Sequence, residues 1–337
     1  MRHPPSSADF ASKRTRTPLT FHSILFATPA DRRGDDALGM PVFFADLNCD
    51  QIVDAIAAGK EEYNLKPFFY DCLRRLDAVT YRHEVMQDLD NTSVLERVNS
   101  FARQMREMRS HLDRVQKMHY KEQKQAWFLD AVEIYCDAIN AFADDLYREN
   151  LKSCGFLGFA DYLVRYASSV RFRSLLTQTK QLKADLARVK YCVLIKGSSF
   201  TVRKYDSEID YSVNVEETFE KFKQGAATDY RVKFSTSEDM NHIEAKVAEF
   251  VAKLHPEVFV ALDEYCARNV DYLDGTVAAF DREIQFYIAY LDYTAMALRA
   301  RAVARVCRIS ATCTASPPNR VPFRSVSLWT AVDTPRR

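Results

Sequence analysis

The sequence predicts a mostly α-helical, elongated protein with a small β-hairpin inserted at the far end of a helix pair. Glycine and proline number only 8 and 11 among 337 residues, so turns are few and the elements between them are long. Apolar residues recur every three or four positions over most of the chain, which is the period of an amphipathic helix. The stretch YCVLIKGSSFTVRKY, residues 191–205, alternates instead and reverses at Gly197-Ser198, which predicts two paired strands.

Composition and charge limit the class of protein. With 47% apolar and 12% aromatic residues the chain can bury a core, so disorder throughout is excluded. The total charge of +1 is unevenly distributed: residues 1–20 have +3 and residues 300–337 have +6, which leaves −8 for residues 21–299. A globally basic nucleic-acid-binding protein is therefore excluded, and any nucleic-acid contact must come from a local basic patch.

The reactive residue types give no sign of a metal site or of a disulfide framework. The eight cysteines include no CxxC pair and mostly fall in helical patterns, which predicts buried, reduced thiols. The histidines show neither HxxxH nor HExxH spacing, so no metal and no other cofactor is expected in this chain. No apolar run approaches the ~20 residues of a membrane span. We expect a soluble, cytoplasmic protein with no membrane partner.

The first part of the chain is predicted to be disordered and then loop-like. Residues 1–20 are rich in Pro, Ser, Thr and Arg, which predicts a disordered extension, and residues 21–40 have a mixed, loop-like sequence. Short helices follow, with Gly59 and Pro67 marking their ends and beginnings.

The clearest helix is predicted to begin at Ser93, because Ser93 and Glu96 have the spacing of a capping box. Apolar residues then follow in steps of four and three, at Val94, Val98, Phe101, Met105, Met108, Leu112 and Val115. Such a heptad seam favours core packing, and it also allows pairing with a helix of another protein.

Further helices are predicted on both sides of the hairpin. Before it we expect one from about Lys121 to Leu146 and another over residues 157–189. After it, IDYSVNVEETFEKFKQG predicts a strand and a short helix, and YRVKFS another strand. The helical pattern resumes at Ser237, breaks at Pro256 and then continues for about forty residues.

The hairpin is the candidate binding element. A two-residue turn at Gly197-Ser198 suits type II′ and pairs residue 195 with 200, 193 with 202 and 191 with 204. One face is then apolar, with Tyr191, Val193, Ile195, Phe200 and Val202. The other face has Lys190, Lys196 and Arg203, with Thr201 and Tyr205 between them.

Residues 186–205 contain five basic residues and no acidic residue, and these five are the candidate DNA-binding residues: Arg188, Lys190, Lys196, Arg203 and Lys204. Two interpretations stay open. The cations could protect an exposed sheet edge, or they could contact the phosphate backbone without recognising sequence.

No catalytic signature is found. A phosphate-binding loop needs GxxxxGK[ST], but GDDALGMP continues with Met-Pro, and AAGKEE lacks the first glycine and the hydroxyl. GxSxG and GxGxxG are also missing. Acidic pairs such as Asp144-Asp145 and Glu216-Glu217 suit a solvated helix face better than catalysis. We therefore expect that this chain is not an enzyme, and an enzyme whose site leaves no sequence signature is the weakest alternative.

One segment resembles a known family. Residues 67–112 are similar to the start of the core domain of MutS-family mismatch-repair proteins, whose line PL-x-D-x-x-x-I-x-x-RQ-x-x-V precedes a leucine-patterned helix. The matching residues here are Leu73, Leu76, Asp77, Val79, Arg82, His83 and Met86, and Asn91 to Leu95 match the gap and the helix start. His83 replaces the usual Gln, and Cys72 stands where Pro is common.

The resemblance implies an architecture and a function. The family has a helical core, lever helices and a small β-rich clamp that closes over DNA, and the full-length family uses ATP and Mg²⁺ for mismatch repair. By this resemblance residues 21–190 are core and outgoing lever, 191–236 the clamp and 237–300 the returning lever. The family's mismatch-recognising Phe-x-Glu and its ATPase domain have no counterpart here, so we expect a truncated MutS-like chain without a motor.

The end of the sequence allows two interpretations. Residues 301–337 lose helical periodicity after Val306 and become rich in Arg, Ser, Thr and Pro, which predicts a disordered tail. The tail is either a frameshift product or a basic segment that contacts nucleic acid.

The function expected is that of a DNA-binding scaffold with duplex DNA as its partner. The alternative is a coiled-coil scaffold that binds another protein through the seam of residues 94–115 and has no DNA role. Whether the chain forms a homodimer stays open.

Overall fold

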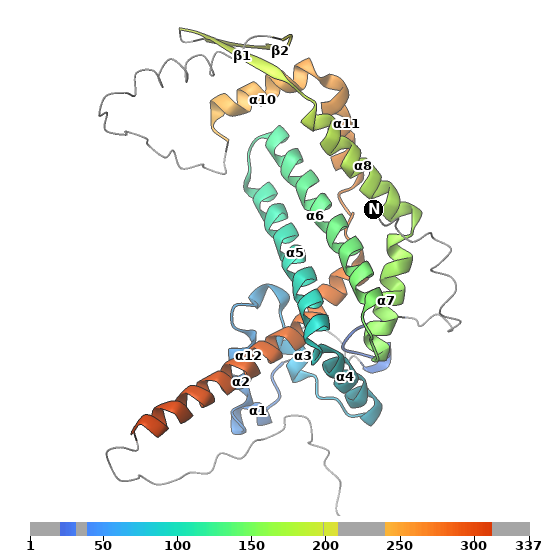
Figure 1. Cartoon of the computed structure of the whole chain (residues 1–337), viewed down its shortest axis with the longest axis vertical. Helices are drawn as coiled ribbons and strands as arrows, with labels where there is room; N and C mark the ends of the chain where they lie inside the picture. Colours follow the sequence, from blue (N-terminus) through green and yellow to red (C-terminus); the bar gives the residue numbers. More distant parts are fainter. Residues whose placement is uncertain (1–20, 32–38, 198, 208–239, 312–337) are drawn as a thin grey trace, which may run out of the picture. The chain divides into compact units, whose positions relative to one another are not determined.

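The computed structural model describes residues 21–31, 39–197, 199–207 and 240–311 (Figure 1). Its described part is mostly helical with one two-stranded antiparallel sheet, which confirms the predicted fold class. The N-terminal extension, the strands and the helix predicted within residues 208–236, and the tail from Thr312 onwards lie outside the described residues. None of the described helices is both long and apolar enough to cross a membrane.

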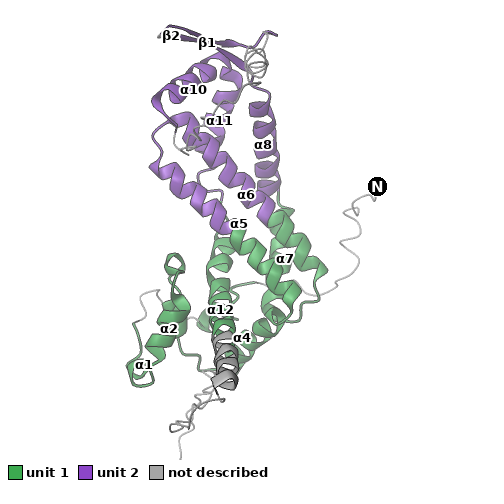
Figure 2. Cartoon of the chain, turned by 60° about the vertical axis from the view of Figure 1, so that its left-hand side comes forward, with its two compact units in different colours: residues 1–103, 139–169, 273–337 green, residues 104–138, 170–272 purple. Residues whose placement is uncertain are grey.

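The chain divides into two compact units (Figure 2). Unit 1 consists of residues 1–103, 139–169 and 273–337, and unit 2 of residues 104–138 and 170–272. The hairpin thus belongs to the same unit as the two helices that come directly after it in the described chain, His242–Leu254 and Pro256–Arg268.

Unit 1 contains the short elements of the first hundred residues. They are η2 (Pro29–Asp31), α1 (Phe43–Asp46), α2 (Cys49–Ala57), η3 (Glu61–Tyr63), α3 (Lys66–Tyr70) and α4 (Leu76–Leu89). Gly59 adopts φ +75° just after α2, and Pro67 lies in the first turn of α3, where its missing N–H costs nothing. Longer helices complete this unit: the first part of α5 (Thr92–Lys117), the last part of α6 (Lys121–Arg148), α7 (Cys154–Ala167) and α12 (Gly275–Ala311).

The core of unit 1 is aromatic. The rings of Phe159 and Phe280 stack with centroids 3.6 Å apart, and those of Phe101 and Phe142 stack at 4.4 Å. These four residues come from four different helices, and further contacts of Phe280 with Phe101 and Phe142 connect the two stacks, so the rings join α5, α6, α7 and α12.

Unit 2 contains the rest of α5 and α6, α8 (Val170–Ala187), β1 (Tyr191–Lys196), β2 (Ser199–Lys204), α10 (His242–Leu254) and α11 (Pro256–Arg268). Tyr135 is completely buried, with its ring 5.3 Å from that of Tyr272. The hydroxyls of Thr179 and Tyr265 are hydrogen-bonded at 2.6 Å in the same interior, which joins α8 to α11.

The predicted seam is mostly core. Its first five residues, Val94, Val98, Phe101, Met105 and Met108, are each at most 1% exposed, whereas Leu112 and Val115 are half-buried. The helix itself begins at Thr92, and the predicted capping box is wrong. Asn91 Oδ1 accepts the N–H of Ser93 at 3.0 Å, while the Ser93 hydroxyl donates to the Glu149 carboxylate instead.

Two predicted helices are each interrupted. The helix predicted over residues 157–189 is α7 and α8, which are separated at residues 168–169. The forty-residue helix predicted after Pro256 is α11 and α12, separated by residues 269–274. Asp274 begins α12 because its Oδ1 accepts the N–H groups of Thr276 and Val277 at 3.0 Å. The break at Pro256 is confirmed, and α12 continues to Ala311, past the predicted loss of helix at Val306.

The cysteines are less buried than predicted. Cys136 is buried, but Cys72 and Cys154 are exposed and Cys49, Cys192 and Cys266 are half-buried. None of these six described cysteines forms a disulfide.

Candidate nucleic-acid interface

The hairpin has the predicted register. Ile195 pairs with Phe200, Val193 with Val202 and Tyr191 with Lys204. Gly197 has φ +60°, a conformation that favours glycine, and no other atom lies within 4 Å of the position its Cβ would take. The turn is therefore both sharp and open on the side of Gly197.

Helix α10 holds the hairpin from one side. It packs against β2, and the ring of Phe250 lies 6.0 Å from that of Phe200. Phe200 and Val202 are accordingly half-buried, whereas Val193 and Ile195 on β1 are 40% and 78% exposed. The apolar face is thus covered along β2 and open along β1.

The two faces of the hairpin are not purely apolar and purely basic, because the register puts one apolar residue on the basic face and one lysine on the apolar face. Leu194 pairs with Thr201 and therefore lies among the cations of the basic face, where it is 39% exposed. Lys204 pairs with Tyr191 and therefore lies on the apolar face. Basic side chains consequently extend from both faces of the hairpin.

All five predicted DNA-binding residues are exposed, but their surroundings differ. Arg188 forms an ion pair with Asp185 at 3.2 Å, and the Lys190 ammonium lies 6.0 Å from the ring centroid of Tyr205. Lys196, Arg203 and Lys204 have no carboxylate within ion-pair distance in the described part of the chain. An anionic partner could engage these three without first breaking an ion pair to a described residue, and the same holds for Lys190 apart from its contact with the Tyr205 ring.

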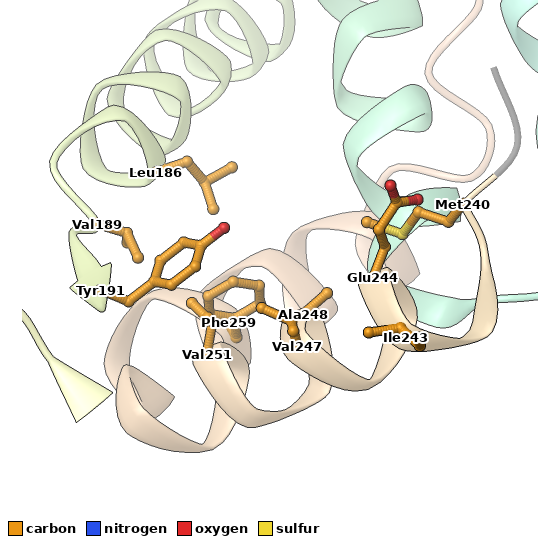
Figure 3. A pocket seen from close by; sticks show the side chains of 10 residues that line it. All are labelled: Leu186, Val189, Tyr191, Met240, Ile243, Glu244, Val247, Ala248, Val251 and Phe259. Atoms are coloured by element: carbon orange, nitrogen blue, oxygen red, sulfur yellow. The ribbon is translucent and has the colours of Figure 1, made fainter. Parts of the chain in front are cut away.

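A groove near the base of the hairpin was missed by sequence reasoning (Figure 3). It has a volume of about 420 Å³ and is lined by Leu186, Val189, Tyr191, Met240, Ile243, Glu244, Val247, Ala248, Val251 and Phe259. Its one carboxylate already caps α10, because Glu244 accepts the N–H of Asn241 at 3.0 Å. The groove therefore offers apolar contact and no acid–base pair. Its residues come from separate segments, and no local pattern predicts such a surface.

The segment that resembles the MutS family forms α3, α4 and most of α5. Arg82 is buried, whereas Leu76 is 79% exposed and His83 is also exposed. Asp77 is exposed and pairs with Arg75, which lowers the pKa of its carboxyl group through their hydrogen bond. The matching residues thus serve different local roles and form no single site.

No metal centre is found within the described ranges, where no three His, Cys, Asp or Glu side chains are grouped as ligands. Comparisons of the chain with protein-family models, with curated proteins and with solved structures found no match.

Proposed function

We propose that this chain is a DNA-binding scaffold of MutS-like type, whose hairpin contacts the phosphate backbone of duplex DNA and does not recognise sequence. The observation that supports this most is the set of three exposed cations, Lys196, Arg203 and Lys204, that have no ion-pair partner among the described residues. Such cations bind phosphates by displacing counterions, which favours association with any duplex.

The charge of the rest of the molecule strengthens this argument. Residues 21–299 have a net charge of −8, so a non-specific interaction with DNA is unfavourable over most of this region. The hairpin concentrates the opposite charge on a small element that contacts α10 through the Phe200–Phe250 ring pair. A local patch on an acidic body favours one defined point of contact with DNA.

Protection of the sheet edge explains the same lysines less completely. Edge strands are commonly shielded by one or two charged side chains. Here cations extend from both faces and from both strands, since Lys196 lies on β1 and Arg203 and Lys204 lie on β2. Edge protection requires no such distribution, whereas a DNA backbone on either side of the hairpin would use it.

The alternative of a protein-binding helical scaffold has less support. Its binding surface is the seam of residues 94–115, but the seam residues up to Met108 are at most 1% exposed. A partner helix could reach only the half-buried end at Leu112 and Val115.

The absence of a P-loop motif from the sequence also bears on catalysis. Nothing in the sequence suits phosphate binding by a P-loop, so we propose that this chain does not hydrolyse ATP and that ATP and Mg²⁺ belong to the full-length family only. A cytoplasmic location and the use of duplex DNA as the partner are part of the same proposal. Whether two copies act together stays open.

Fluorescence anisotropy with two duplexes of unrelated sequence tests the proposal. The substitutions Lys196→Gln, Arg203→Gln and Lys204→Gln, combined in one chain, should weaken binding to both duplexes equally, by about tenfold or more. A matched control replaces three exposed cations elsewhere in unit 2, Lys117, Arg173 and Lys180, with Gln and so removes the same charge. Equal loss in both triple variants, or no loss in the hairpin variant, would refute the proposal.

A further inference from the structure

Residues 21–26, Phe-His-Ser-Ile-Leu-Phe, form a strap that lies inside unit 1 without belonging to any helix or strand. Ser23, Ile24, Leu25 and Phe26 are 4%, 0%, 1% and 2% exposed. A buried segment without secondary structure must have its backbone groups paired by other means, because an unpaired buried N–H or C=O is costly.

Side chains pair the carbonyl groups of the strap. Three consecutive carbonyl oxygens, those of Ser23, Ile24 and Leu25, each accept one hydrogen bond, from Tyr81 Oη at 2.6 Å, Tyr287 Oη at 3.1 Å and Arg82 Nε at 3.0 Å respectively. The donors come from α4 and α12, two helices far apart in sequence.

One buried carboxylate and one serine pair the N–H groups. Glu283 Oε2 accepts the N–H of Ile24 at 3.1 Å and the hydroxyl of Ser23 at 2.6 Å. The Ser23 oxygen in turn accepts the N–H groups of Leu25 and Phe26, both at 3.0 Å. The strap therefore has a hydrogen-bonding partner at each position from Ser23 to Phe26.

The apolar side chains of the strap also pack closely against residues of the neighbouring helices. The Arg82 guanidinium lies over the ring of Phe26, 5.0 Å from its centroid. Ile24 lies against Gly155 of α7, where a Cβ would come within 3.0 Å of Ile24 Cδ1. The ring of Phe21 lies 5.0 Å from that of Phe159. The strap thus contacts three helices through shape as well as through polar groups.

The strap turns after Ser23, and side chains of α4 and α12 pair its carbonyl groups, which differs from ordinary helix packing. Arg82 and Glu283 are 3% and 5% exposed, and burying such charges is costly unless specific partners compensate. Here Arg82 Nε donates to the strap, and Glu283 accepts two hydrogen bonds from it. The geometry points to a binding site in unit 1 for an apolar peptide that turns after a central serine, filled by this chain's own residues 21–26. The same site accepts this segment in trans, from a second copy of the chain.

Peptide exchange on the intact fold tests this inference. A protease recognition sequence is placed within residues 32–38, outside the described residues, and the folded full chain is cut there. The probe is a synthetic peptide of residues 17–31 with a fluorophore at its N-terminus, in excess over the cut chain. We expect saturable uptake of the probe, seen as a rise in anisotropy, with no uptake by the uncut chain at the same concentration.

Two variants distinguish specific binding of the probe from its non-specific association with the cut chain. A probe with Ile24→Asp should bind at least about tenfold more weakly, because a carboxylate would replace a fully buried apolar side chain. The substitution Glu283→Gln in the chain should weaken uptake of the normal probe, since a neutral amide accepts the Ser23 and Ile24 hydrogen bonds less strongly. Equal binding of both probes would overturn the inference. So would a cut chain that unfolds and is not restored by added peptide.

Discussion

The Nε atom of Arg82 donates a hydrogen bond to the carbonyl oxygen of Leu25 at 3.0 Å, in the interior of unit 1. Burial lowers the pKa of this guanidinium from its usual value, while nearby Tyr287, Asp71 and Glu283 act in the opposite direction. The side chain also lies over the rings of Phe26 and Phe286. Arg82 thus binds the backbone of the strap through a charge-assisted hydrogen bond and the adjacent rings through its face.

Replacing this arginine should be strongly destabilising. Arg82→Met keeps much of the volume but leaves the Leu25 carbonyl without its donor in a buried position, so the free energy of unfolding should fall by about 2–4 kcal/mol. Urea denaturation followed by circular dichroism measures the change. Arg74→Met, at an exposed position in the same unit, is the control and should change stability by less than about 0.5 kcal/mol. Arg82→Met with the stability of the control would show that the bond to Leu25 is unimportant.

Gly155 allows α4, α7 and the strap to approach one another. A Cβ at this position would lie 2.8 Å from Val85 Cγ2, 2.9 Å from Tyr81 Oη and 3.0 Å from Ile24 Cδ1. Gly155→Ala should therefore lower the free energy of unfolding by about 1–3 kcal/mol through overpacking.

Gly275 is the matched control for that substitution. It also lies in the first turn of a helix of unit 1, but no atom is within 4 Å of its Cβ position. Gly275→Ala should be neutral or stabilise the protein by up to about 1 kcal/mol. Thermal melting compares the two variants, and a Gly155→Ala variant as stable as Gly275→Ala would contradict the close approach.

The strap illustrates what the sequence could not reveal. Its six residues have no helical or strand period, so they were predicted correctly as a loop, but nothing in them shows burial. Their partners, Tyr81, Arg82, Glu283 and Tyr287, lie about sixty and about two hundred and sixty residues away. Polar contacts over such sequence separations leave no local pattern.

Local features were predicted best. The hairpin register follows from alternation and a Gly-Ser turn, both of which are contained in fifteen residues, and it is confirmed at each predicted pair. The break between α11 and α12 was missed because apolar spacing continues across residues 269–274, whereas the cap at Asp274 is a single polar residue. The five candidate DNA-binding residues were all predicted to be on or beside the hairpin, but only the structure shows that Arg188 pairs with Asp185, whereas Lys196, Arg203 and Lys204 have no ion pair with a described residue.

Thiol reactivity should follow burial. Burial raises the pKa of the Cys136 thiol to about 12, whereas Cys72 and Cys154 are exposed. At about pH 9 iodoacetamide should modify Cys72 and Cys154 first and Cys136 only after unfolding, because the thiolate is the reactive form. Mass spectrometry of the alkylated peptides measures the order, and early modification of Cys136 would contradict its burial.

The raised pKa of Cys136 also implies that the free energy of unfolding falls at alkaline pH. The folded state holds the Cys136 proton more tightly than the unfolded state does, so this contribution to stability is complete below the ordinary thiol pKa of about 8.5. It is lost as the pH rises from there towards about 12. Chemical denaturation at increasing pH should show this fall, and Cys136→Ala should reduce it.

Nucleotide should have no effect on this chain. With no P-loop in the sequence, Mg-ATP should neither be hydrolysed nor raise the melting temperature, although a ligand at about a hundred times its Kd would add about 2.7 kcal/mol. Differential scanning fluorimetry and a phosphate-release assay measure both properties. A clear increase in melting temperature with Mg-ATP, absent with Mg²⁺ alone, would reveal a nucleotide site.

The salt dependence of duplex binding tests the central claim most directly. Each phosphate that a cation neutralises adds about 0.9 to the slope of log K against log salt concentration, so removing Lys196, Arg203 and Lys204 should flatten the slope by about 2 to 3. Titrations of a labelled duplex between about 50 and 200 mM salt give the slopes of the original chain, the hairpin triple variant and the control variant of Lys117, Arg173 and Lys180. The proposal predicts a flatter slope for the hairpin variant alone. An unchanged slope and affinity in that variant would contradict the assignment of the hairpin as the DNA contact.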